Sequence, residues 1–323
     1  MVRGTGSTNA RTDAAAFDEI VRHARGTGTA KSVGCYVRSV PPRLSGEAAS
    51  FAARMNPANR TPLEALNLPP GVLAPAALTV LVSKYWGPQQ EEYTVSFMER
   101  TPANLRARIV EHMNAWSTRI GKSFVETASG PGLIRISLDQ DGYWSYLGTD
   151  VALIPEDQPT MSLQDFSMST PESEYRRVVR HETGHTLGFP HEHMRAEVVA
   201  RIDPKKAYKY FLENQGWDQA TVDDQVLTPL DAADILGTPP DEDSIMCYQL
   251  PGEITYDGKD IDGGEDINAT DFHFAEKLYP QADGTGSGRR KGSRKAGATK
   301  SATPWMAEDW GPGNDVDLSK FGQ

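Results

Sequence analysis

The stretch HETGHTLGFPH, residues 181–191, decides how the rest of the chain is interpreted. His181 and His185 are four residues apart, so on a helix their side chains stack on one face and can bind one metal ion. Zinc accepts imidazole nitrogens and is stable with three protein ligands and one open position. Glu182 stands beside the first histidine, where its carboxylate can take a proton from a water molecule that the metal polarises. The spacing therefore predicts a catalytic zinc site on a helix.

The residues after His185 predict how a third ligand reaches the same ion. Gly188 can adopt the left-handed conformation that ends the helix, and Pro190 blocks its continuation. His191 then returns to the metal as a third nitrogen ligand. A bare HExxH pattern also occurs by chance on surface helices. The glycine and the third histidine at fixed offsets favour the metal site instead.

A second motif agrees with this interpretation. The segment DSIMCY, residues 243–248, places Met246 about 55 residues after the third histidine. A methionine in a short apolar run by itself predicts only a buried turn. In combination with the extended histidine motif it is typical of the methionine-containing turn of metzincin proteases, the Met-turn.

These two motifs resemble those of the metzincins, and the longer string HETGHTLGFPHEHMR is similar to the signature of the astacin family. That signature continues beyond the third histidine with Glu192 and Arg195, and the family places a tyrosine where Tyr248 stands. The resemblance implies an α+β zincin fold, with a twisted mixed sheet, a long active-site helix and a Met-turn. It also implies one catalytic Zn²⁺ ion.

The resemblance further implies roles for individual residues. Met246 would form an apolar floor beneath the zinc ligands, and Glu192 would be a buried anchor. Tyr248 would be a movable extra ligand whose phenol bonds the oxyanion of the tetrahedral intermediate. His193 is expected at the surface, because three histidines already suffice for the metal.

The chain also departs from the family pattern. The family's arginine is usually followed by Asp-Arg-Asp, whereas AEVVARID follows Arg195 here. The usual disulfides are absent, since Cys247 is the only cysteine of the predicted catalytic region. Serralysin-like enzymes share the Met-turn tyrosine, but their glycine-rich calcium repeats are not found in this sequence.

Net charge and hydropathy limit the kinds of binding partner that we expect. The chain has 323 residues and a formal net charge of -11, so we expect no nucleic-acid partner. No apolar run approaches the ~20 residues of a membrane span. The first residues lack an apolar h-region, so no signal peptide is visible, and we expect a cytoplasmic or non-classically exported protein. The sequence does not indicate the oligomeric state.

Composition along the chain predicts three parts. Residues 1–77 are rich in Pro, Gly, Ser and Ala and indicate an irregular leader or pro-like segment. Residues 78–282 form the predicted catalytic domain, and residues 283–323 a flexible tail with basic and acidic stretches.

Hydrophobic periodicity places the main elements of the catalytic domain. Strands are expected at 78–82, 93–98 and 133–139, and helices within 101–121, 169–188, 204–216 and 267–280, the last capped by Asn268. An extended substrate is expected along an edge strand, either TMSLQDF at 160–166 or its neighbour.

Cys35 lies in the leader and has more than one interpretation. A thiolate can close the open zinc position in a latent form, as a leader cysteine does in matrix metalloproteases. Alternatively it is a small buried residue, which the lack of the usual switch motif favours. A disulfide between Cys35 and Cys247 is also open. So is a zinc-binding leader aspartate, although Asp13 and Asp18 stand in an apparent helix.

The sequence therefore predicts a zinc-dependent endopeptidase that acts on protein or peptide substrates, with Glu182 as general base. One alternative is a catalytically silent metzincin that binds peptides or partner proteins. The joint presence of Glu182, Tyr248 and three histidines argues against it. Another alternative is a zinc amidase acting on a cell-wall peptide, which the shape of the site decides.

Overall fold

The computed structural model describes residues 35–59, 83–230 and 240–281. In chain order the helices and strands are β1 (Cys35–Arg38), α2 (Ser45–Met55), β2 (Glu91–Phe97), α5 (Ala103–Met113), β3 (Lys122–Glu126), β4 (Ile134–Ser137), β5 (Tyr143–Tyr146), β6 (Met161–Leu163), α6 (Glu172–Glu174), the π-helical turn η5 (Tyr175–Val179), α7 (Arg180–Thr186), α8 (Ala196–Val199), α9 (Pro204–Gln215), α10 (Gln219–Val222), a second π-helical turn η7 (Asp223–Leu227) and α11 (Ala269–Leu278).

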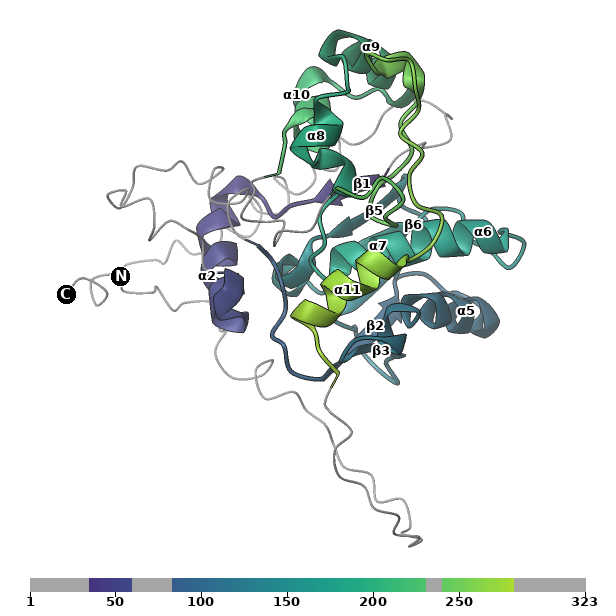
Figure 1. The fold of residues 1–323 in the computed structure, drawn as a ribbon. Helices are drawn as coiled ribbons and strands as arrows, with labels where there is room; N and C mark the ends of the chain where they lie inside the picture. The colour runs from purple at the N-terminus through teal and green to yellow at the C-terminus, as the bar shows by residue number, and fades with distance from the viewer. Residues whose placement is uncertain (1–34, 60–82, 231–239, 282–323) are drawn as a thin grey trace, which may run out of the picture. The chain divides into compact units, whose positions relative to one another are not determined.

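The described strands form one mixed sheet in the order β1-β5-β6-β4-β2-β3. β5 is antiparallel to β6, and the other neighbouring pairs are parallel. The predicted mixed sheet is confirmed. The expectation that residues 160–166 hold an edge strand is wrong, because β6 pairs with β4 on one side and β5 on the other. β5 is separated from the edge of the sheet only by β1 (Figure 1).

Residues 35–59, the part of the leader that the structure describes, contain a strand and a helix that the composition does not predict. β1 lies parallel to β5, with Tyr36 opposite Trp144 and Val37 opposite Ser145. Ala48 and Ala52 are fully buried on α2, so the alanines that suggest low complexity form a closely packed helix face. A four-residue strand carries too little pattern to be recognised without its partner.

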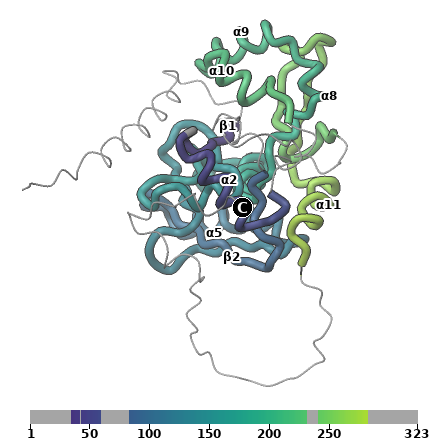
Figure 2. Tube along the Cα trace, turned by 90° about the vertical axis from the view of Figure 1, so that its left-hand side faces the viewer, coloured from purple at the N-terminus to yellow at the C-terminus, as the bar shows by residue number. Residues whose placement is uncertain are grey.

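Two long helical segments support the sheet, as expected. α6, η5 and α7 run consecutively from Glu172 to Thr186, and α7 packs on β5. α5 packs against η5 and β3. The helices α8, α9 and α10 gather away from the sheet in both views (Figure 1, Figure 2).

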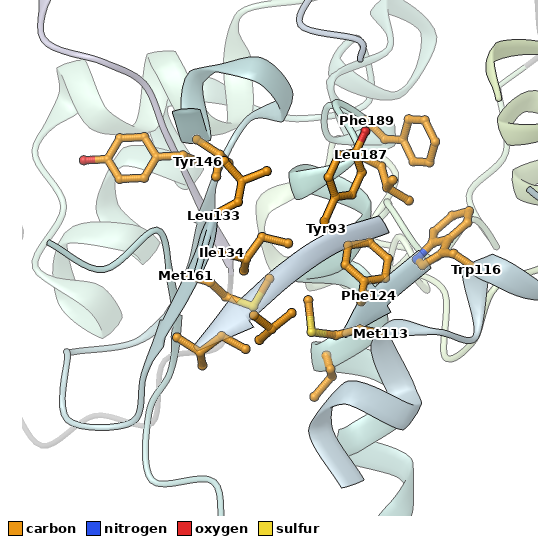
Figure 3. Packing of buried hydrophobic residues seen from close by; sticks show 14 of the residues in the cluster. Tyr93, Met113, Trp116, Phe124, Leu133, Ile134, Tyr146, Met161, Leu187 and Phe189 are labelled. Carbon is orange, nitrogen blue, oxygen red and sulfur yellow. The ribbon is translucent and has the colours of Figure 1, made fainter. Parts of the chain in front are cut away.

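The buried apolar side chains form two clusters. The larger one joins the sheet to α5 and η5; Figure 3 shows part of it, including Tyr93, Met113, Phe124 and Ile134. The smaller one lies around α9, α10 and the segment after Met246. Met246 belongs to the larger cluster and Tyr248 to the smaller, so the predicted Met-turn lies where the two clusters meet.

Some expectations concern residues outside the described ranges. These are the strand at 78–82, the leader aspartates Asp13 and Asp18, and the tail at 283–323. Among the described residues, none of the helices has the length and apolar character required to cross a bilayer.

The predicted cap of the last helix is confirmed. The Asn268 side chain accepts from the Thr270 and Asp271 N–H groups at 2.7 and 2.9 Å, and Asp271 accepts from the Asn268 N–H at 2.9 Å. This reciprocal capping box satisfies N–H groups that the helix leaves without intrahelical partners.

Replacing Asn268 by Ala should lower the free energy of unfolding by about 0.5–2 kcal/mol, because the cap oxygen is lost. Denaturant unfolding with an unchanged m-value would measure this. Asn214→Ala, at an exposed position of α9, is the matched control and should cost much less. Equal losses in the two variants would contradict the assignment.

Candidate active site

The two histidines of α7 are buried side by side with their ring nitrogens fixed. The ring centroids of His181 and His185 lie 4.6 Å apart. His181 Nδ1 contacts the Ile245 carbonyl at 2.5 Å, and His185 Nδ1 contacts the Phe189 carbonyl at 2.7 Å. A carbonyl can only accept, so each Nδ1 carries the proton and each Nε2 keeps its lone pair.

A turn after α7 brings the third histidine to the other two. Gly188 has a φ of 97°, and its N–H donates to the His185 carbonyl at 2.8 Å. His191 then lies with its ring centroid 4.6 Å from that of His185 and 5.3 Å from that of His181. The Nε2 atoms of His185 and His191 are 3.1 Å apart. The predicted helix end at Gly188 is confirmed.

The electrostatics of this group suit a cation. Burial lowers the pKa of His181 to about 4, and lowers the pKa values of His185 and His191 well below the usual range. The rings are therefore neutral at pH 7 and offer nitrogen lone pairs. His181 Nε2 is buried and has no hydrogen-bond partner among the described residues, and a bound ion would satisfy it. The donor set fits zinc.

Within the part of the chain that the structure describes, two further oxygen atoms near the histidines lack hydrogen-bond partners. These are Glu182 Oε2 and the Tyr248 hydroxyl, and both are buried. Burial raises the pKa of Glu182 to about 8, and it raises the pKa of Tyr248 well above the usual range. The Tyr248 ring lies 5.0 Å from that of His191, measured between centroids. Both groups are buried beside Cys35, whose thiol lies within hydrogen-bond reach of the Glu182 carboxylate.

Cys35 lies inside the same group. Its thiol and one nitrogen from each of His181, His185 and His191 all lie within 4.8 Å of one another. Cys35 is buried, as the interpretation of a small packed residue expects. Its thiol also lies beside the histidine nitrogens, where a metal ligand would lie. Cys35 and Cys247 are both free thiols, so the disulfide alternative is wrong.

His193 is buried, and the expectation of a surface residue is wrong. Its ring packs on Tyr248 at 4.1 Å and on His191 at 4.7 Å, between centroids. Its Nε2 contacts the Gln225 carbonyl at 3.0 Å. The expectation rested on the number of metal ligands, which does not predict burial for other reasons. His193 is buried because its ring packs against the rings of the site.

The Met-turn is held beneath α7 from two sides. A Cβ atom built at Gly184, between the two helix histidines, would overlap the Met246 sulfur. From below, the Asp271 carboxylate accepts from the Ser244 hydroxyl at 2.5 Å and from the Ile245 N–H at 3.0 Å. The residue that completes the cap of α11 therefore also fixes the carbonyl that orients His181. The glycine between two predicted ligands was the available signal for this close approach.

Glu192 is largely buried, as expected of an anchor. Its N–H donates to the Met246 carbonyl at 2.9 Å, which ties the third-histidine segment to the Met-turn. Its carboxylate accepts from Arg195 at 2.8 Å and from the Asp241 N–H at 3.2 Å.

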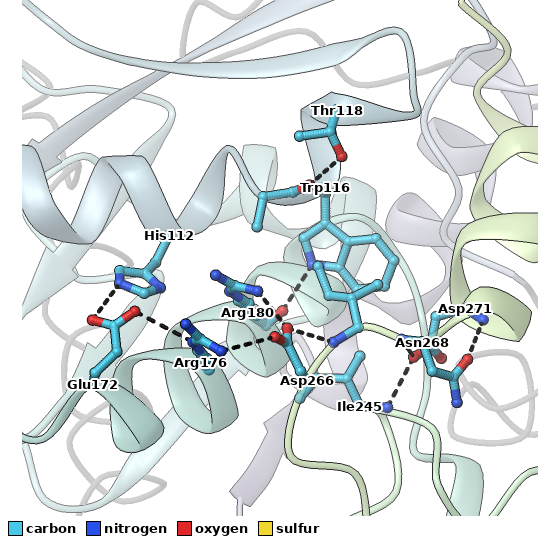
Figure 4. A network of polar contacts seen from close by, with 12 residues as sticks. His112, Trp116, Thr118, Glu172, Arg176, Arg180, Ile245, Asp266, Asn268 and Asp271 are labelled. Carbon is cyan, nitrogen blue, oxygen red and sulfur yellow. Dashed lines mark hydrogen bonds and ion pairs between the residues drawn. The ribbon is translucent and has the colours of Figure 1, made fainter.

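A polar network fixes the active-site helix along its length (Figure 4). Arg176 and Arg180 both pair with Asp266, which lies just before α11. At the other end, Glu172 pairs with His112 at 3.4 Å. The network joins α5, the helix at 172–186 and the segment that leads into α11.

The mixed sheet, the histidine-bearing helix and the methionine turn define an α+β protein of the metzincin class. The family model described as Astacin, a family of peptidases, matches residues 80–254, more than half of the chain. The chain belongs to the astacin family of metallopeptidases.

Individual relatives agree with this assignment. The zinc metalloproteinase nas-27 of Caenorhabditis elegans is 32% identical over 102 residues, which is 32% of this chain and 22% of the relative. The match thus spans about a fifth of that relative's length. The solved structure of myroilysin aligns with a TM-score of 0.57 and 28% identity, over 61% of this chain and 96% of that one.

Gly184→Ala should destabilise the chain by about 1–3 kcal/mol, because the added methyl group displaces Met246 from beneath the histidines. In a Met246→Ala background the same change should cost less, since the space is then free. Thermal or denaturant unfolding of the four chains measures this coupling. Strictly additive effects would contradict the close contact.

Proposed function

We propose that this chain is a zinc-dependent endopeptidase that hydrolyses internal bonds of proteins or peptides. Its support is the buried group of His181, His185 and His191 with Glu182 and Tyr248 beside it. His181, His185 and His191 would hold a zinc ion, which would supply Lewis acidity to the scissile carbonyl and would lower the pKa of water so that a hydroxide nucleophile forms near pH 7.

The chain's own residues then handle the protons and the developing charge. The Glu182 carboxylate takes a proton from the attacking water and delivers it to the leaving amine. The Tyr248 hydroxyl donates to the oxyanion, a type of contact worth roughly 2.7–4 kcal/mol. Met246 packs against Gly184 between the two helix histidines, and Glu192 ties the segment of the third histidine to the Met-turn, so both hold the site in place. A silent peptide-binding metzincin would not need two buried groups, Glu182 and Tyr248, without hydrogen-bond partners among the described residues.

We further propose that the chain as described is latent. The Cys35 thiolate would serve as a fourth ligand at the position where water must bind. β1 covers β5, whose edge would otherwise be open to an extended peptide. The leader would then block both the metal and the strand that receives substrate, and activation would require its release.

Cys35→Ser should raise the basal cleavage of unfolded casein by the full-length chain on the order of tenfold or more, because a serine hydroxyl is a poor zinc ligand and the latent state is less favoured. Chelator-sensitive casein hydrolysis with the metal content measured in parallel checks this. Cys247→Ser, at the other buried free thiol, is the matched control and should stay latent. Unchanged activity in Cys35→Ser would exclude the switch.

Glu182→Gln, made in the Cys35→Ser chain, should keep about one zinc per chain and lose cleavage by about 10²–10⁴-fold, because only the proton acceptor is removed. Metal analysis and single-turnover peptide cleavage measure the two quantities separately. Glu111→Gln, at an exposed position of α5, should change neither. Most of the turnover surviving in Glu182→Gln would sink the general-base role.

A further inference from the structure

β1 is bound along both of its edges, but only one edge is paired with a strand. In an extended chain the N–H and C=O groups of successive residues point to opposite edges. On the edge away from β5, the Val37 N–H donates to Oε1 of Gln225 at 3.0 Å. Gln225 Nε2 donates back to the Val37 carbonyl at 3.3 Å. A single carboxamide thus makes the two bonds that a neighbouring strand would make.

Gln225 is held in place for this contact. The residue lies in η7 and is buried, with 4% of its surface exposed. Its Nε2 also donates to the Asp224 carboxylate at 2.7 Å, and its main-chain carbonyl meets His193 at 3.0 Å. Since His193 packs on Tyr248 and His191, the main chain of Gln225 is held by a ring that contacts the histidine site.

The contact is to the main chain, so it does not depend on which side chain the bound segment carries. We propose that Gln225 is a peptide-binding residue that holds the N–H and C=O of one residue of the extended segment lying beside β5. In the present state that segment is the leader strand, and after activation it is the substrate. The inference rests on the proposed endopeptidase function and names how its substrate is held.

A carboxamide suits both occupants. It offers one acceptor and one pair of donors, and its terminal torsion is broad and roughly two-fold. A half-turn exchanges oxygen and nitrogen, so Gln225 can pair with a segment that runs in either direction. The required chemistry of the ligand is an extended peptide with a secondary amide at this position. A proline or an N-methylated residue there lacks the N–H.

The first test needs no catalysis. In the full-length chain, Gln225→Met keeps the length of the side chain but removes its donor and acceptor. Hydrogen exchange of the Val37 amide should accelerate on the order of tenfold relative to wild type. Gln219→Met, at an exposed position of α10, should leave it unchanged. An equally protected Val37 amide in Gln225→Met would overturn the proposal for the leader.

The second test concerns the substrate. A fluorogenic peptide, N-methylated at one position at a time, is cleaved by the Cys35→Ser chain with and without Gln225→Met. At one position, methylation should lower kcat/KM about five- to tenfold with Gln225 present and about twofold or less in its absence. Each ratio is taken within one chain, so the fraction of molecules with β1 displaced cancels. Identical methylation profiles in the two chains would overturn the proposal.

A conservative variant separates binding from folding. Gln225→Glu keeps an oxygen that can accept from the peptide N–H but loses the donor to the peptide carbonyl and to Asp224. A folded Gln225→Glu chain should therefore show less sensitivity to methylation than the chain with Gln225, and a sensitivity above that of the chain with Gln225 would contradict the proposed pairing. If the Cys35→Ser chain binds the peptides without cleaving them, the endopeptidase proposal fails. The same methylation profile measured as Kd then still decides the role of Gln225.

Discussion

The contact between His181 Nδ1 and the Ile245 carbonyl connects the two halves of the site. An imidazole can present a lone pair to a metal only if its proton is held on the other nitrogen. The carbonyl that holds it belongs to the Met-turn, so the Met-turn must be placed before the histidine can be oriented. Asp271 and the Gly184–Met246 contact both serve this placement. The helix, the turn and the cap of α11 therefore form one unit.

The second constraint is that β1 is held through its main chain. It pairs with β5 on one edge and with the Gln225 carboxamide on the other. Neither contact depends on a side chain of β1, whereas Cys35 approaches the histidines through its thiol. In the proposed latent state, binding would combine a general affinity for extended peptide with one specific anchor. Removal of that anchor would then let another peptide compete.

The sequence predicted those parts whose residues stand close together along the chain. The histidine motif, the turn at Gly188 and the cap at Asn268 each lie within about a dozen residues, so spacing alone reveals them. The burial of His193 and the pairing of Gln225 with Val37 depend on segments far apart, which leave no local pattern. The strand at Cys35 is hidden for the same reason, because four residues acquire strand character only from β5. The alanines of α2 were misread because small residues serve both linkers and tight packing.

The separation of Val37 and Gln225 by 188 positions has a consequence for biosynthesis. During synthesis β1 emerges before either of its partners, since β5 is made about a hundred residues later and η7 about two hundred residues later. Closing so long a loop costs entropy that only the assembled partners can offset. β1 therefore lacks its glutamine contact until translation has passed residue 225. One edge of this strand can be paired well before the other.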